Sequence, residues 1–374
     1  MSDLKTPAAP KAPFTKGSGP LGTDTTGVLV AEPKGRTGAS RILLGRDAIM
    51  IYALLVVVIG ACLLVPRFAS PVTVGFLLLD VIPILLIAMP MTLVIITGEI
   101  DLSVASTAGL TSAVIGVLWA GGGMDIGVVL LIGLLVGVVA GAFNGFLIAV
   151  VGLPSLAVTI GTLALFRGLA LVVIGDNAVA NFPPELTAFF TSKIGSTGIP
   201  VVMVGVLVVV LAFGVVLHLT PFGRGLYALG YSTEAASFVG IRVGHAKFWL
   251  FIATGTVAGL VGVFLTLRLA SAGPDNGTGM ELSVIAAVLL GGVSIFGGKG
   301  SIPGVIGGVL LIGVLTYSLR LAKVPETALI IVTGSLLVIS VVAPSVTAWA
   351  KERIRLSRVH KVVQGSSTLG STHA

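Results

Sequence analysis

The chain has 374 residues and a formal net charge of +7, with 55% apolar residues and only 10% charged residues. Soluble globular domains carry about 25% charged residues, so this composition excludes a soluble protein and predicts an integral membrane protein. The positive charge does not indicate nucleic-acid binding, because Lys and Arg in membrane proteins mainly set their orientation in the lipid bilayer.

The apolar residues gather in segments of helical length, separated by short polar turns. Runs of about 17–25 apolar residues are typical of membrane-spanning helices, whereas barrel strands give weaker signals of about ten residues. The sequence therefore predicts an all-α membrane protein with about ten transmembrane helices. We expect these helices near residues 47–65, 74–97, 104–120, 126–151, 155–174, 200–219, 248–269, 282–296, 302–321 and 326–343.

The two ends of the chain differ from its apolar middle. Residues 1–40 are rich in Pro, Gly and Thr and contain no apolar run, so we expect a disordered tail. Residues 41–346 form the predicted transmembrane domain. Residues 347–374 form a second tail, which is basic.

Lys and Arg are distributed unevenly between the two sides of the predicted bundle. If the helices alternate in direction, both tails, residues 220–247 and the turn at Lys299 fall on one side, and they hold sixteen of the 22 Lys and Arg residues. By the positive-inside rule this side is the cytoplasm. We therefore expect both termini in the cytoplasm and residues 175–199 and 271–279 on the outer side.

The longest polar stretch between two apolar runs, residues 220–247, contains a short helical pattern. Thr233 is a suitable N-cap residue and Gly240 a suitable C-terminal stop. A short capped helix between two spans suits docking into a groove on another protein. A solvated helix that contacts nothing is the alternative.

Small residues predict where two helices approach closely. Gly133, Gly137, Gly141 and Gly145 recur every four residues and so form one face of a helix. Gly255 and Gly259 share a face of the helix expected at residues 248–269. Such faces let the backbones of membrane helices come together.

Two carboxylates, Glu99 and Asp101, lie between apolar runs with almost no loop around them. A carboxylate at bilayer depth costs about 3 kcal/mol on insertion scales, so it tends to face a cavity or a partner. Both residues are candidates for a translocation pathway. For Asp101 we favour the alternative that it caps the N-terminus of the helix that follows.

Further polar residues lie within or beside the apolar runs. Asn144 and Arg167 either line a pathway or pair with carbonyl groups of a broken helix. Asp80 lies in a run that also contains two prolines, Pro83 and Pro90, whose missing N–H groups leave carbonyls to be satisfied by neighbouring helices. Arg268 and Arg320, near the ends of spans, are expected to extend toward the membrane surface.

The sequence contains no recognisable enzyme site. Its histidines are not spaced with Cys, Asp or Glu as in a metal site. Gly298-Lys299 does not complete a phosphate-binding loop, because Val293 replaces the first Gly and Gly300 replaces the Ser or Thr. We therefore expect no cofactor on this chain, and any ATP chemistry must come from a partner.

A short internal similarity accompanies these features. Asp101-Leu102-Ser103-Val104 resembles Glu281-Leu282-Ser283-Val284, and the two segments open helices that run in opposite directions in the expected topology. Such a pair fits an inverted repeat, a common arrangement in transporters. Chance explains four residues equally well.

The motifs, taken together, resemble the permease subunit of sugar-type ABC importers of the ribose, xylose and rhamnose class. The resemblance covers about residues 47–343. The motifs occur in the family's order: Gly98-Glu99-Ile100-Asp101-Leu102-Ser103, Gly152-Leu153-Pro154 leading to Thr159-Ile160-Gly161-Thr162, Thr220-Pro221-Phe222-Gly223-Arg224, Gly230 through Glu234-Ala235-Ala236 to Gly240-Ile241, Glu281-Leu282, and Gly291-Gly292-Val293-Ser294 through Gly297-Gly298-Lys299-Gly300-Ser301 to Gly304.

The resemblance implies a role for each part of the chain within a bacterial inner membrane. A coupling helix would dock into a cytoplasmic ATPase that uses ATP, and a periplasmic sugar-binding protein would deliver a pentose, deoxyhexose or related sugar to the outer loops. A second permease copy, identical or related, would help to enclose the path. The coupling helix would comprise Gly230, Ser232, Glu234, Ala235, Ala236 and Gly240. Candidate pathway residues are Glu99, Asp101, Asn144, Arg167, Asn276 and Glu281.

Two departures and two alternatives accompany this resemblance. Glu99 stands where the family usually has Gly, and Ser232 where it often has Asn. A branched-chain amino-acid ABC permease has a similar organisation. An ion-coupled secondary transporter, with Glu99 and Asp101 as coupling carboxylates, is the alternative from another class.

Overall fold

A computed structural model describes residues 46–175 and 177–342, together with residues 346, 349 and 353. The described residues fall within a single compact unit. The expected disordered tail, residues 1–40, lies outside the described residues, as does almost all of the expected basic tail, residues 347–374.

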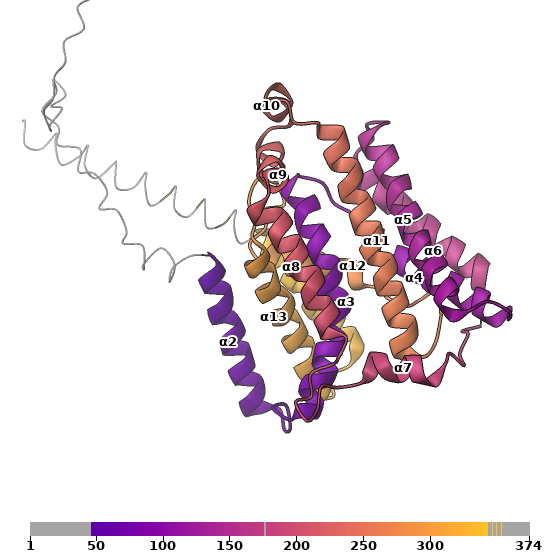
Figure 1. Cartoon of the computed structure of the whole chain (residues 1–374). Coiled ribbons are helices and arrows are strands. Elements are labelled where there is room, and N and C mark those ends of the chain that lie inside the picture. Colours follow the sequence, from indigo (N-terminus) through magenta and orange to yellow (C-terminus); the bar gives the residue numbers. More distant parts are fainter. Residues whose placement is uncertain (1–45, 176, 343–345, 347–348, 350–352, 354–374) are drawn as a thin grey trace, which may run out of the picture. The chain divides into compact units, whose positions relative to one another are not determined.

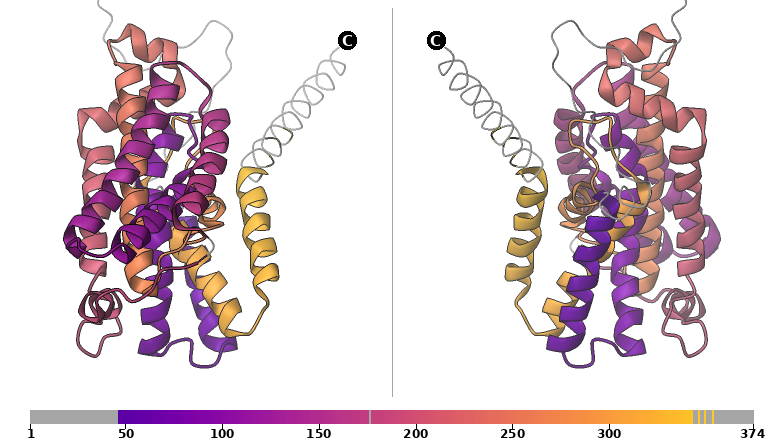
Figure 2. Two further views of the ribbon diagram at one scale, coloured as in Figure 1. Left: turned by 90° about the vertical axis from the view of Figure 1, so that its right-hand side faces the viewer. Right: turned by 90° about the vertical axis from the view of Figure 1, so that its left-hand side faces the viewer.

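Helices are the regular secondary structure of the described part of the chain, and two isolated bridges, Val179 with Ala272 and Lys193 with Pro200, lie in its loops. The predicted all-α fold is therefore confirmed. The helices are α2 (Arg46–Leu64), α3 (Pro71–Ile96), α4 (Val104–Ala120), α5 (Ile126–Ala149), α6 (Ser155–Ile174), α7 (Pro184–Thr191), α8 (Met203–Leu219), α9 (Pro221–Tyr231), α10 (Thr233–Phe238), α11 (Val243–Leu269), α12 (Met280–Leu290) and α13 (Ile302–Leu321), followed by a helical segment, Glu326–Val342. In Figure 2 this last segment (yellow) turns back after α13 and runs in the opposite direction.

The prediction of about ten spans is not confirmed by helix length. Among the described residues, α3, α5, α6, α11 and α13 are long and apolar enough to cross a membrane, and α8 with α9 qualifies as a sixth, bent by 68°. The other apolar helices, Met50–Leu64, α4, α12 and Glu326–Val342, have 10–17 residues. α4 nevertheless covers the expected residues 104–120, and α2 differs from its expected bounds by one residue at each end.

The clearest departure from an expected span is α12, which ends at Leu290 where residues 282–296 were expected to form one helix. The chain leaves the helix at Gly291, and Gly292 adopts a positive φ of 90° that favours glycine. With 11 residues, α12 is about 16 Å long, roughly half of a hydrocarbon core. α12 is therefore a half-length helix.

α11 connects the two ends of the bundle, which we call the Lys247 end and the Arg268 end. Figure 1 shows α9 and α10 at the same end of the bundle as the first turns of α11, and α7 beside its last turns. The backbone amide of Gly298 donates to the carbonyl of Ile96 at the Lys247 end, and Val179 pairs with Ala272 at the other end. The loops expected on one side of the membrane thus lie together, although which side is cytoplasmic stays a prediction.

The predicted glycine faces meet where α5 packs on α11. A Cβ on Gly141 would overlap the carbonyl oxygen of Phe251 and lie 3.0 Å from the Cα of Gly255, and one on Gly137 would lie 2.7 Å from the Cα of Gly259. The two backbones are therefore in direct contact, as small residues allow in membranes. Gly133 departs from this pattern, because it faces Ile115 of α4.

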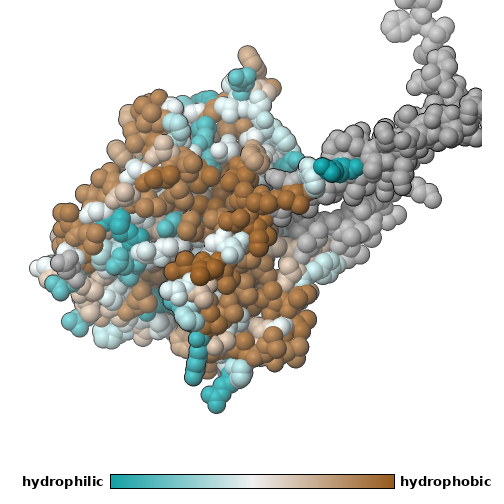
Figure 3. Space-filling view, turned by 180° about the vertical axis from the view of Figure 1, so that it is seen from behind, coloured by the Kyte–Doolittle hydropathy of each residue, from teal (hydrophilic) through white to brown (hydrophobic). Residues whose placement is uncertain are grey.

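α3 forms the centre of the core, and its C-terminal half is buried on all sides. Apolar side chains are also exposed on the surface of the bundle. They lie along α5, α6 and α8 and include Val139, Val172 and Leu211. Apolar residues also cover most of the face drawn in Figure 3. A helical protein that is apolar inside and outside is suited to a lipid environment.

Candidate functional site

α10, at the Lys247 end, is the short helix that the sequence indicated, although its cap differs from the prediction. Ser232 is the N-cap residue, and its Oγ accepts a hydrogen bond of 3.1 Å from the amide of Ala235. The expectation that Thr233 caps the helix is wrong, because Thr233 is its first residue. Gly240 follows the C-cap with a φ of 86°, so its role as the stop is confirmed.

The surface of α10 is open to a partner. Glu234 and Ala235 are exposed, and only Ala236 of this helix is buried. Phe238 at its end is 90% exposed and Val239 is 75% exposed. Large apolar side chains left bare at the polar end of a membrane protein are typical of a protein-binding surface.

Gly230 has a packing role in this segment. A Cβ at this position would overlap the carbonyl oxygen of Ile96 and the amide of Gly298. The amide of Gly298 in turn donates a hydrogen bond of 2.8 Å to Ile96. Three backbone segments, the end of α3, the end of α9 and the turn at Gly298, therefore meet without intervening side chains.

Glu99 forms an ion pair with Lys247 on α11. The two side chains are 15% and 19% exposed, so the pair is largely shielded from solvent. The pair connects the loop between α3 and α4, residues 97–103, to the helix that follows α10. We call residues 97–103 the junction loop.

Asp101 is the most deeply buried carboxylate among the described residues, at 1% exposure. Its Oδ1 accepts hydrogen bonds from the amide (3.0 Å) and hydroxyl (2.7 Å) of Ser103, and its Oδ2 accepts one of 2.7 Å from Thr254 on α11. Ser103 is the N-cap residue of α4, so Asp101 satisfies one of the free amides at the start of this helix, in agreement with the favoured capping role. Through Thr254 the carboxylate also joins this helix start to α11.

Asn144 extends this buried network onto α5. Its Nδ2 donates a hydrogen bond of 2.8 Å to the hydroxyl of Ser103, while its buried Oδ1 has no donor among the described residues. Glu99, Asp101 and Asn144 were all predicted as pathway residues. The structure places the three around the junction loop, and their pathway role stays a prediction.

Arg167 and Asn276 meet a different loop, residues 270–279. Arg167 on α6 donates to the carbonyl oxygen of Pro274, and Asn276 Nδ2 donates to Ser112 on α4 (2.8 Å) and to the carbonyl of Ser271 (3.0 Å). The loop thereby reaches the middle of α4. α12 begins directly after it, inside the bundle.

Glu281 lies in the first turn of α12. Its Oε2 is buried and has no hydrogen-bond partner among the described residues. Half-length helices that begin inside a bundle are a recurrent element of transporter substrate sites. Of the six predicted pathway residues, three therefore surround the junction loop and two contact residues 270–279, while the buried oxygen of Glu281 bonds to neither group among the described residues.

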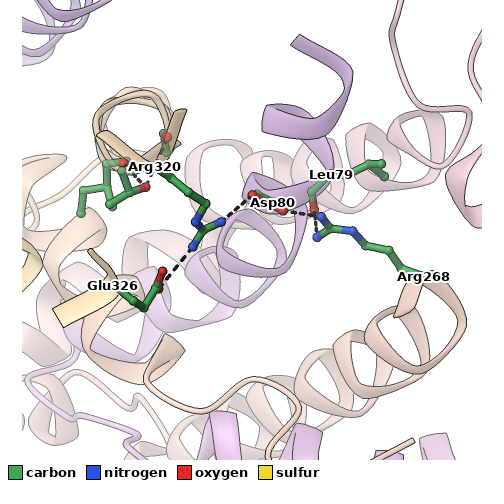
Figure 4. Close-up of polar contacts among 8 residues, drawn as sticks. Leu79, Asp80, Arg268, Arg320 and Glu326 are labelled. Carbon is green, nitrogen blue, oxygen red and sulfur yellow. Dashed lines mark hydrogen bonds and ion pairs between the residues drawn. The ribbon is translucent and has the colours of Figure 1, made fainter. Parts of the chain in front are cut away.

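A second polar cluster lies at the Arg268 end and was not predicted as a unit (Figure 4). Arg268 and Arg320 were expected to extend toward the membrane surface, but both form ion pairs with Asp80 on α3. Arg320 also contacts Glu326 at 3.3 Å. The sequence signal for this cluster was a carboxylate inside one apolar run and two arginines at the ends of other runs. Sequence alone does not show that these residues pair with one another.

An apolar cavity of about 530 Å³ lies between α3, α7, α8 and α11. Its lining contains aliphatic and aromatic side chains and glycine, and no hydroxyl, amide or charged side chain. Ligand sites for polar molecules contain a few placed polar groups. The chemistry of this cavity therefore does not suit a sugar.

The amino-acid sequence matches a family of known proteins. Residues 73–341 match the family model described as "Branched-chain amino acid transport system / permease component". The chain belongs to this permease family. No solved structure matches the chain.

Curated relatives of this permease agree in their function. The autoinducer 2 import system permease protein LsrD of Salmonella typhimurium is 35% identical over 288 residues, which cover 75% of this chain and 86% of the relative. The LsrD protein of Escherichia coli O9:H4 is 33% identical over 313 residues, covering 82% and 94%. That of Photorhabdus laumondii is 35% identical over 274 residues, covering 72% and 81%.

The resemblance drawn from the motifs is confirmed by these matches. The chain is the permease subunit of an ABC importer of the sugar type, a multi-pass protein of the inner membrane. The match ends at residue 341, close to the suggested limit at 343, but it begins at residue 73, well after the suggested start at 47.

Proposed function

We propose that this permease imports a small sugar, a pentose, deoxyhexose or related compound, and that ATP hydrolysis in a separate cytoplasmic subunit drives the import. The observation that carries the proposal is α10. This short capped helix projects exposed Glu234, Phe238 and Val239 between α9 and α11. A partner bound there acts directly on α11, which runs the length of the bundle.

The other partners follow from the same proposal. A periplasmic binding protein docks at the Arg268 end and delivers the solute, and a second permease copy, identical or related, completes the path. The Lys247 end is then cytoplasmic. This chain binds no cofactor of its own, and ATP is bound by the partner subunit.

An ion-coupled mechanism receives less support from the geometry. In that mechanism Glu99 and Asp101 would have to exchange an ion with solution. Glu99 is instead paired with Lys247, and Asp101 accepts hydrogen bonds from both sides of its carboxylate. α10 also has no role in a transporter that works alone.

The substrate requires a direct comparison of three classes. The relatives are named for autoinducer 2 import, and the family description names branched-chain amino acids. We propose a small sugar because the motifs at residues 220–224 and 291–304 resemble those of sugar-type permeases. Uptake of radiolabelled pentoses, autoinducer 2 and leucine by cells with and without the gene separates the three.

The first experiment is purification of the permease from its native membrane in mild detergent, with Glu234→Lys as the variant and Glu326→Lys as the control. We expect an ATPase to co-purify with the wild type and the control and to be lost from Glu234→Lys. Absence of any ATPase from the wild-type preparation, combined with uptake that a protonophore abolishes, would contradict the proposal.

A further inference from the structure

The junction loop, residues 97–103, is bonded to three helices besides the two that it connects. On α11 it contacts Lys247 through Glu99 and Thr254 through Asp101. Lys247 and Thr254 are seven residues apart, which is two helical turns, so they lie on the same face of α11. The loop is therefore held along one side of this helix.

The same loop is bonded on its other side to α5 and α6. The amide of Ile100 donates to Ser155 Oγ at 3.3 Å, and Thr159 Oγ1 donates to the carbonyl of Ile100 at 3.3 Å. Ser103 accepts the hydrogen bond from Asn144. A displacement of the loop thus acts on α5 and α6 as well as on α4, which begins at Val104.

The Glu99–Lys247 ion pair lies close to α10 along the chain, so a movement of α10 would displace it. α10 ends at Phe238, and α11 begins at Val243 after four residues. Lys247 lies in the second turn of α11. Movement of α10 therefore reaches Lys247 before it reaches the rest of the helix.

We propose that the junction loop transmits movement from α10 to α4, α5 and α6, and that the Glu99–Lys247 ion pair is the positioning contact for this transmission. The proposal rests on the proposed function, because it requires an ATPase bound at α10. In this mechanism Glu99 positions the loop and does not touch the sugar. The mechanism requires two discrete arrangements of the loop against α11, because packed elements amplify local shifts by switching between such arrangements.

The physical basis is the shielding of the pair. Exposed ion pairs contribute little to stability, whereas removing one member of a buried pair leaves an uncompensated charge and costs more. With both side chains less than 20% exposed, Lys247 therefore constrains the position of the loop. Glutamine in place of Glu99 keeps the size of the side chain but removes this constraint.

The test uses the complete importer, permease with ATPase and binding protein, reconstituted in liposomes. The variants are Glu99→Gln, Lys247→Gln and the charge exchange Glu99→Lys with Lys247→Glu. The matched control is Glu326→Gln, which removes an exposed carboxylate of an ion pair at the other end. ATP hydrolysis stimulated by the binding protein and solute uptake are both measured.

We expect each single variant to assemble with the ATPase and to hydrolyse ATP within about twofold of the wild type. Uptake per ATP hydrolysed should fall about tenfold. The charge exchange should recover at least half of the wild-type ratio, and the control should equal the wild type. A purely stabilising role would lower the amount of assembled complex but leave this ratio unchanged, and that result would overturn the proposal.

A second measurement decides the matter if a single variant fails to assemble. Cysteines replace Glu99 and Lys247 in a background where Cys62, which is exposed, is replaced by serine. A flexible bismaleimide then links the two positions. The unlinked protein lacks the ion pair, so its uptake per ATP hydrolysed should be low, and linking should raise this ratio because the loop is again held to α11. A ratio that complete linking leaves unchanged would overturn the inference.

Failure of the inference and failure of the proposed function give different results. If the wild-type permease does not assemble with an ATPase, the proposed function fails. If it assembles and transports while all the Glu99 and Lys247 variants keep the wild-type ratio, only the inference fails.

Discussion

Arg268 on α11 donates a hydrogen bond of 2.8 Å to the carbonyl oxygen of Leu79 on α3. In a regular helix this carbonyl accepts from the amide four residues later, but that residue is Pro83, which has no N–H. Arg268 therefore supplies the missing donor and pairs with Asp80 at the same time (Figure 4). A proline in the centre of the bundle is tolerated because an arginine from another helix completes its hydrogen bonding.

We predict that Arg268→Met destabilises the protein by about 1–3 kcal/mol, because it leaves both Asp80 and the Leu79 carbonyl without this donor. Thermal unfolding in detergent measures the loss. Arg320→Met is the matched control, since Arg320 is 52% exposed and its pair should contribute less than about 1 kcal/mol.

The link to the proline can be tested separately with a double-mutant cycle. Pro83→Ala restores an amide N–H that can donate a hydrogen bond to the Leu79 carbonyl. Arg268→Met should therefore lower the free energy of unfolding less in that background than in the wild type. Equal costs in the two backgrounds would show that the Asp80 ion pair alone accounts for the role of Arg268.

Gly141→Ala is predicted to destabilise the protein by about 1–3 kcal/mol, because the added methyl meets the backbone of α11 and no flexible side chain can yield. Gly168→Ala in α6 is the control, since nothing lies within 4 Å of its added Cβ. Both substitutions add one methyl group at a position within a helix. Unfolding midpoints that fall equally would contradict the close contact between α5 and α11.

Gly205→Leu on α8 is predicted to stabilise the protein by about 0.5–2 kcal/mol, because Gly205 lines the apolar cavity and has open space at its Cβ. Gly214→Leu on the same helix also has open space but does not line the cavity, so it should gain less. Uptake should be unchanged in both. Loss of uptake in a stable Gly205→Leu protein would instead place this cavity on the solute path.

Phe238→Ser is predicted to weaken ATPase binding at least tenfold while leaving the fold intact, because this ring is almost fully exposed at the end of α10. Aromatic anchors of this kind often dominate the energy of an interface. Affinity for the purified ATPase can be measured by biolayer interferometry in detergent. Phe189→Ser, which changes a half-exposed ring at the Arg268 end, should leave the affinity unchanged.

The local features that sequence predicted well are those that depend on periodicity or backbone geometry. The glycine faces of α5 and α11 and the stop at Gly240 follow from residue spacing and from the positive φ that glycine accepts. The apolar segments gave the location of the helices for the same reason. Their lengths were less predictable, because α12 ends at a pair of glycines inside an apolar run that continues to Phe296.

The partners of the charged residues could not be predicted from the sequence. Glu99 and Lys247 are 148 positions apart, and their contact depends on the packing of α11 beside α3. Asp80, Arg268 and Arg320 come from three helices in the same way. The choice between Ser232 and Thr233 as the cap of α10 was also undetermined, since both side chains suit that position.

The contact among Gly230, Ile96 and Gly298 is made by main-chain atoms alone. This part of the attachment of α9 therefore does not depend on the side chain of Ile96, whereas Leu226 and Leu229 add buried side-chain packing. Substitutions in α10 can alter the exposed surface at Glu234, Phe238 and Val239 without disturbing the way in which the segment is held. A permease built in this manner can adapt to a different ATPase subunit by changing a few surface residues, while its attachment site stays the same.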